Sequence, residues 1–253
     1  MTGTGRPATA GGREGGVEMR LPPEGEVWIW RVPLTGAEAG EFEGSLSGDE
    51  LSRAGRFVFA RDRVRFAAAR GWLRKILGEI LAVVPAEVKF SYGEWGKPEI
   101  SGELSRSGVC FNSSHAGDAG VIAVSVRMRL GVDVEAVRGD MDMPLVARSH
   151  FSIREFGDWS RLADGERKAG FFRCWVRKEA YLKGLGTGVS RGLNNFSVSV
   201  SADAPAALLE DELSPGAPAR WVLRDLAVEQ GFAGCVAVEG KPLVLRYFDG
   251  KSF

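Results

Sequence analysis

A long amphipathic segment restricts the fold of the first half of this chain more than any other feature. Between Asp62 and Leu81, apolar side chains recur at spacings of three and four residues, which is the period of a helix with one buried face. The recurring residues are Phe66, Ala69, Leu73, Ile76, Leu77 and Ile80. The polar side of the helix is expected to comprise Arg63, Arg70, Arg74 and Lys75. Pro85 follows and ends the helix.

Short apolar segments around this helix predict an α+β chain with two halves. Strands are expected at residues 27–30, 88–92, 110–112, 120–126, 131–134, 196–200 and 233–238, and further helices at residues 144–162 and 167–185. A loop at residues 113–119 is expected to join two paired strands. We place the two halves at residues 19–128 and 129–253, each mixing strands with one or two helices. Residues 1–18, rich in Gly, Thr and Ala, predict a disordered arm, and residues 201–220 a variable loop.

The composition argues against several classes of protein. Lys plus Arg and Asp plus Glu number 33 each in 253 residues, and a zero net charge argues against a general nucleic-acid binder. The three cysteines lie far apart without a CxxC pair, so we expect neither a disulfide framework nor a zinc site. The sequence contains no run of about 18 apolar residues and no apolar signal-peptide core, so we expect a cytoplasmic protein without a membrane segment.

Two acidic residues share one face of a predicted strand. Alternate side chains of a strand point to opposite faces, so Asp133 and Glu135 lie together while Val132 and Val134 enter a core. Two carboxylates at such a short distance repel each other, and a bound divalent cation relieves this repulsion. Oxygen ligands favour Mg²⁺, Ca²⁺ or Mn²⁺ over zinc. The alternative is a half-exposed strand with two solvated acids.

A second charged group lies on the last predicted helix. Residues four apart share a helical face, so Trp175, Glu179 and Lys183 form one stripe. Glu179 can supply a third carboxylate to a metal ion, and Lys183, one turn later, can reach a phosphate oxygen. The alternative is a simple Glu–Lys helix pair, worth about 0.3–0.5 kcal/mol and without a chemical role.

Polar and basic residues of the first half are candidates for an anion site. His115 follows Ser114 in the predicted loop, where hydroxyl groups, backbone N–H groups and an imidazolium can meet a phosphate. Arg53 lies upstream of the long helix, and Lys97 lies in a turn with a glycine before it and a proline after it. These two cations can bind a phosphate if they converge on His115. The alternatives are a capped turn for the loop and solvated surface positions for the cations.

Several motifs, taken in order, resemble the signatures of one family. FNSSH (111–115), GVDVE (131–135) and WVRKEAYLKGLGTG (175–188) resemble those of 4'-phosphopantetheinyl transferases of the larger, pseudodimeric type that activates surfactin synthetase. RFVFARD (56–62) and GKP (96–98) match the same family in place and order. Each motif alone is modest, and the five together are specific. The Walker motif GxxxxGK[ST] does not occur in the sequence.

The resemblance implies a pseudo-twofold fold of two similar halves, each a small antiparallel sheet packed on a long helix, with coenzyme A in the cleft between them. It also implies a magnesium site with Asp133, Glu135 and Glu179 as ligands. Glu179 and Lys183 match the catalytic residues of the family. Because the pseudodimer builds its cleft within one chain, a monomer is expected.

The remaining implied roles concern the two substrates. Arg53 and His115 match contacts to the 3'-phosphate of coenzyme A, and Lys97 and Ser114 match contacts to its nucleotide end. The implied reaction moves the 4'-phosphopantetheine group of coenzyme A onto a serine of an apo acyl or peptidyl carrier protein and releases 3',5'-ADP. The sequence does not select a fatty-acid, polyketide or nonribosomal-peptide carrier. The alternatives are a catalytically silent relative that holds coenzyme A or a carrier, and another magnesium-dependent phosphotransferase acting on a nucleotide.

Overall fold

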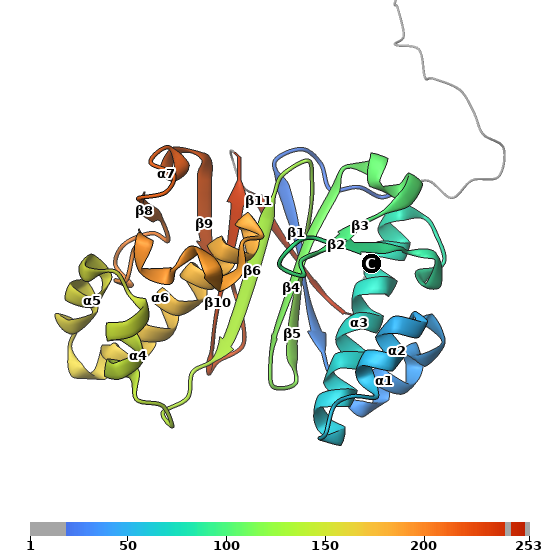
Figure 1. The fold of residues 1–253 in the computed structure, drawn as a ribbon, viewed down its shortest axis with the longest axis horizontal. Helices are drawn as coiled ribbons and strands as arrows, with labels where there is room; N and C mark the ends of the chain where they lie inside the picture. The colour runs from blue at the N-terminus through green and yellow to red at the C-terminus, as the bar shows by residue number, and fades with distance from the viewer. Residues whose placement is uncertain (1–18, 241–243, 251–253) are drawn as a thin grey trace, which may run out of the picture.

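The computed structural model of the protein describes residues 19–240 and 244–250. Two β-sheets lie in the middle of the molecule, and a long helix covers the outer side of each (Figure 1). The predicted arm at residues 1–18 lies outside the described residues. No helix in the described part of the chain is long and apolar enough to cross a membrane.

The first sheet has the strand order β11-β1-β5-β4. Its strands are β1 (Glu26–Pro33), β4 (Val109–Ala116), β5 (Ala119–Val126) and β11 (Val244–Asp249). The helices of this half are α1 (Gly36–Phe42), α2 (Gly48–Ala54) and α3 (Ala60–Leu81). A small hairpin follows, formed by β2 (Phe90–Tyr92) and β3 (Pro98–Ile100). The central pairs β1–β5 and β4–β5 are antiparallel, whereas β11 pairs in parallel with β1.

The second sheet has the order β6-β10-β9 and is antiparallel throughout. Its strands are β6 (Leu130–Ala136), β9 (Trp221–Asp225) and β10 (Phe232–Glu239). The helices of this half are α4 (Met143–His150), α5 (Ile153–Ser160), α6 (Asp164–Leu185) and α7 (Ala217–Arg220). A short pair, β7 (Phe196–Val198) and β8 (Leu208–Asp211), lies beyond α6.

Strand alternation divides the apolar side chains between different cores. In β1, Trp30 and Val32 pack into the core formed with α3, whereas Val27 and Ile29 belong to the core between the two sheets. Apolar residues of β5, β6 and β10 join that central core. The two sheets are therefore held together by side chains from both halves of the chain, which fixes the position of β4 relative to β6.

The α+β class and the two similar halves are confirmed, with one helix of 22 residues in each half. Strand β11 differs from the prediction of two antiparallel sheets. It lies near the end of the chain, yet it pairs in parallel with β1 of the first sheet. The predicted loop at residues 113–119 is wrong: strand β4 continues to Ala116, and Gly117 and Asp118 alone make the turn to β5. This puts Ser114 and His115 on a strand.

Three further predictions need correction. The single helix expected at residues 144–162 is two helices, because the chain is extended at Phe151 and Ser152 and Ser152 caps α5. The expected variable loop at residues 201–220 contains β8 and α7. Arg74, expected on a polar helix face, is buried and donates to Glu50 at 2.6 Å and to two backbone carbonyls.

Candidate functional site

Two glycines bring the strand β6 and the helix α6 into direct backbone contact. A Cβ atom added to Gly131 would lie 2.1 Å from the backbone nitrogen of Gly184 and 2.2 Å from the carbonyl oxygen of Ala180. Side chains larger than hydrogen therefore do not fit at this crossing. The close approach puts the carboxylates that follow Gly131 against the stripe on α6.

The central contact of the site joins Ser114, Asp133 and Lys183. The Lys183 ammonium donates to Asp133 Oδ1 at 2.6 Å and to Ser114 Oγ at 2.9 Å, and Ser114 Oγ donates to Asp133 Oδ1 at 2.8 Å. These residues come from β4 in the first half and from β6 and α6 in the second. Three residues predicted from separate motifs therefore meet where the two halves join.

Asp133 is buried, and only one of its two carboxylate oxygens is satisfied. Its side chain is 4% exposed, and Oδ2 has no hydrogen-bond partner among the residues that the structure describes. Val132 and Val134 lie in the core between the sheets, as predicted, and this directs Asp133 and Glu135 toward α6. A buried carboxylate oxygen without a donor is costly unless another group, such as a cation, meets it.

Burial and the negative charge of Asp133 shift the pKa values of the other two acidic residues, Glu135 and Glu179. Burial, followed by the negative charge of Asp133, raises the pKa of Glu179 above its ordinary value. The same two causes in the same order raise the pKa of Glu135, and a hydrogen bond from Trp175 opposes them. Trp175, Glu179 and Lys183 thus face β6 as one stripe, in agreement with the helical spacing.

The donor set fits a hard divalent cation, although it does not form a complete cage. The three carboxylates supply oxygen ligands alone. Burial and then the negative charge of Asp133 raise the pKa values of Glu135 and Glu179, and a cation relieves that repulsion. Within residues 19–240 and 244–250, no three His, Cys, Asp or Glu side chains are grouped closely enough to hold a metal ion. To hold such an ion, Asp133, Glu135 and Glu179 would therefore have to come closer together and take further oxygen ligands from substrate or water.

His115 and Arg53 both belong to the first half of the chain, but no described contact joins Arg53 to His115 or to the rest of the site. His115 is exposed, and partial burial, then the charges of Lys183 and Arg65, lower its pKa. Arg53 is also exposed, and its guanidinium lies 5.4 Å from the centre of the Phe66 ring. The structure thus associates His115 with Lys183, whereas Arg53 makes its described contact with α3.

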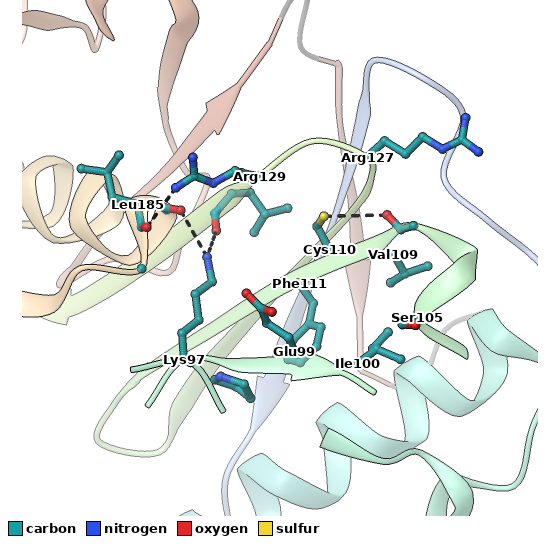
Figure 2. A pocket seen from close by; sticks show the side chains of 16 residues that line it. Lys97, Glu99, Ile100, Ser105, Val109, Cys110, Phe111, Arg127, Arg129 and Leu185 are labelled. Atoms are coloured by element: carbon teal, nitrogen blue, oxygen red, sulfur yellow. Dashed lines mark hydrogen bonds between the residues drawn. The ribbon is translucent and has the colours of Figure 1, made fainter. Parts of the chain in front are cut away.

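Lys97 occupies a different environment from the one expected for a surface cation. Its ammonium donates to the backbone carbonyls of Lys183 at 2.7 Å, Leu130 at 2.9 Å and Gly184 at 3.3 Å. Figure 2 shows Lys97 reaching from the β2–β3 hairpin toward the end of α6. A cavity of about 490 Å³ opens beside this contact, lined by β3, the start of β4 and the end of α6.

Some residues of the motifs hold the site together and escaped sequence reasoning. Asn112 is buried, and its Oδ1 accepts the backbone N–H of Val132 at 2.8 Å, which joins the two sheets beside Asp133. Lys178 is buried on α6 and donates to both oxygens of Glu155, at 2.7 and 2.5 Å. Asn112 and Lys178 both lie within motifs that the sequence analysis quoted, FNSSH and WVRKEAYLKGLGTG. The motifs do not show which residues these two side chains contact.

Comparison with known proteins identifies the family. A family model described as the 4'-phosphopantetheinyl transferase superfamily matches residues 129–237, and one described as 4'-phosphopantetheinyl transferase, N-terminal, matches residues 40–127. The 4'-phosphopantetheinyl transferase HetI of a Nostoc species is 38% identical over 217 residues, which cover 85% of this chain and 88% of the relative. The chain belongs to the 4'-phosphopantetheinyl transferase superfamily.

Other relatives agree with this assignment. A putative 4'-phosphopantetheinyl transferase of a Synechocystis species is 32% identical over 166 residues, covering 66% of this chain and 67% of the relative. A phosphopantetheinyl transferase of a Thraustochytrium species is 30% identical over 204 residues, covering 74% of this chain and 70% of the relative. The predicted family, of the larger type, and the predicted class of enzyme, a transferase, are confirmed.

Proposed function

We propose that this phosphopantetheinyl transferase moves the 4'-phosphopantetheine group of coenzyme A to a serine hydroxyl of an apo carrier protein and releases 3',5'-ADP. Mg²⁺ is the proposed cofactor. The contact among Ser114, Asp133 and Lys183 carries the proposal, because it joins an ammonium, a hydroxyl and a buried carboxylate between the halves. The names of the relatives support the class of reaction.

The nucleotide end of coenzyme A is assigned to the first-half side of the site. His115 is exposed and lies within the electrostatic reach of Lys183 and Arg65, so a phosphate placed there meets three groups that can carry positive charge. The 3'-phosphate is assigned to His115, with Arg53 as a second contact. Ser114, one residue before His115, presents its hydroxyl on the Lys183 side.

Lys183 is suited to the charge that develops on the leaving phosphate. An ammonium has three N–H groups, and two of those of Lys183 have acceptors within the described residues, namely Asp133 and Ser114. The third can meet a phosphate oxygen. In the transfer, the carrier serine Oγ bonds to the phosphorus that bears pantetheine, the bond from that phosphorus to the nucleotide phosphate oxygen breaks, and Lys183 neutralises the oxygen that leaves.

Glu179 is the proposed acceptor of the serine proton. Its pKa is raised by burial and by Asp133, so its carboxylate is a stronger base than one in water. Asp133, together with Glu135 and Glu179, would hold the metal ion, and substrate oxygens and water would complete its coordination. Bound Mg²⁺ would neutralise charge on the pyrophosphate of coenzyme A.

The test is a mass measurement on carrier proteins. The purified chain is incubated with coenzyme A, Mg²⁺ and a panel of apo acyl and peptidyl carrier proteins, and each carrier is weighed intact. A gain of about 340 Da, the mass of one phosphopantetheine arm, that disappears with EDTA supports the reaction and identifies the carriers accepted.

Two variants sharpen this test. Asp133→Asn should abolish the gain while the protein stays folded, and Asp140→Asn, which changes an exposed acid after β6, should leave it intact. Turnover near that of wild type in Asp133→Asn would refute the metal assignment. Absence of any gain, with coenzyme A still bound, would indicate a catalytically silent binding protein instead.

A further inference from the structure

We infer that Lys97 is a positioning residue of the transfer reaction, which holds Lys183 and Asp133 in register by clamping the backbone segments that carry them. This inference rests on the proposed function for its catalytic meaning. It differs from the role that the family resemblance implies for Lys97, a contact to the nucleotide end of coenzyme A.

The hydrogen bonds of Lys97 leave no donor for a nucleotide. A lysine ammonium has three N–H groups, and Lys97 has three carbonyl acceptors, on Leu130, Lys183 and Gly184. A phosphate would have to displace one of these carbonyls. Because the side chain is partly buried, a displaced carbonyl would lose its partner in a desolvated place.

The three carbonyls belong to the two segments that meet at the site. Leu130 begins the strand that carries Asp133, and Lys183 and Gly184 lie in the last turn of α6. Lys97 enters from the β2–β3 hairpin of the other half, so one side chain ties together three separate elements. The backbone of Lys183 is held at 2.7 Å by Lys97 while its own ammonium lies 2.6 Å from Asp133.

The charge of Lys97 matches its place at a helix end. The last carbonyls of a helix lack partners within the helix and carry a partial negative charge, which a cation stabilises. Arg129 supplies a second cation to the same end, since it donates to the carbonyl of Leu185 at 2.9 Å. The Arg129 side chain is more exposed, and its described hydrogen bonds go to Glu239 and the Leu185 carbonyl instead of to Lys183 or Leu130, which makes it a matched control.

The test compares steady-state kinetics of three variants with wild type, with coenzyme A varied against a carrier that wild type modifies. Lys97→Met removes the three donors and keeps the unbranched side chain up to the position of Cε, Lys97→Arg keeps a cation, and Arg129→Met removes the neighbouring cation. We expect kcat to fall about 100-fold in Lys97→Met, as for a displacement of about 1 Å at a reacting group, with KM for coenzyme A changed less than about threefold. Lys97→Arg should recover part of kcat, and Arg129→Met should stay within about twofold of wild type.

A second measurement does not depend on activity. The chain has two histidines, so the titration of His115 can be followed by NMR in each variant. Burial and then the charge of Lys183 lower the pKa of His115. Displacement of Lys183 in Lys97→Met should therefore move that pKa upward, whereas Arg129→Met should leave it unchanged.

The outcomes separate this inference from the proposed function. Inactive wild type would defeat the proposed function, and the NMR measurement would still test whether Lys97 positions Lys183. Active wild type with a raised KM and an unchanged kcat in Lys97→Met would overturn the inference and favour a nucleotide contact. An unchanged kcat together with an unchanged His115 titration would overturn it as well.

Discussion

Replacing Gly131 with alanine tests whether the site depends on direct contact between the backbones of β6 and α6. The new Cβ would lie 2.1 Å from the nitrogen of Gly184, and an ordinary contact of 3.4 Å requires the two elements to separate by about 1.3 Å. The ion pair between Lys183 and Asp133, now 2.6 Å long, would then exceed hydrogen-bonding distance.

The expected losses of stability and activity follow from this separation. Overpacking in a core costs about 1–3 kcal/mol, which for a chain of this length lowers Tm by about 2–12 °C. A displacement of about 1 Å at reacting groups lowers kcat/KM about 100-fold. Both are measured on the same preparation, by calorimetry and by transfer of phosphopantetheine to an apo carrier.

The control is the same substitution elsewhere on α6. Gly165 lies in the first turn of the helix with open space around its Cβ position, so Gly165→Ala should stabilise the protein by about 0.5–1 kcal/mol and leave activity unchanged. If Gly131→Ala does not fold, Gly184→Ala probes the same crossing more gently, because its Cβ meets the Trp221 ring at 2.6 Å. Wild-type Tm and turnover in Gly131→Ala would refute the reasoning.

Three further changes test other parts of the structure. Glu155→Gln should lower the free energy of unfolding by about 3–5 kcal/mol in urea, since it leaves the buried Lys178 ammonium without its counter-charge; a loss below about 1 kcal/mol would contradict this. Asn112→Ala should cost about 1–3 kcal/mol, because the buried N–H of Val132 loses its acceptor, and no change in the urea midpoint would show that another acceptor replaces it. Burial lowers the pKa of Lys97 from 10.5 to about 8, so between these values the unfolded chain binds more protons and Lys97 makes stability rise with pH. Over the same range kcat should fall as the clamping ammonium is lost, and the Lys97→Met variant should lack both slopes; parallel profiles in the two proteins would count against the assignment.

The local part of the site was predictable because it follows from periods of two and of nearly four residues. Alternation along β6 separates Asp133 and Glu135 from the valines, and helical spacing aligns Glu179 with Lys183. Both patterns are complete within a few residues of sequence, so no knowledge of the tertiary fold is needed to find them.

The remaining features depend on contacts between distant segments and leave no local pattern. The strand β11 pairs with β1, which lies more than 200 residues earlier in the chain, and the sequence of β11 itself does not predict this pairing. The acceptors of Lys97 are backbone carbonyls, which every residue has, so residue types cannot predict them. Burial of Arg74 likewise depends on Glu50, a partner from another helix.

The charges on α6 distinguish structural from reactive positions within a single stretch of helix. Burying several charges on one helix is costly unless each one finds a partner. Arg177 is paired with Asp225, Lys178 with Glu155, and Lys183 with Asp133. Glu179, among the described residues, has neither an ion pair nor a hydrogen bond, and burial raises its pKa. The helix therefore neutralises every cation between Arg177 and Lys183 and leaves one carboxylate uncompensated beside Asp133, which is the arrangement that a metal ion or a transferred proton requires.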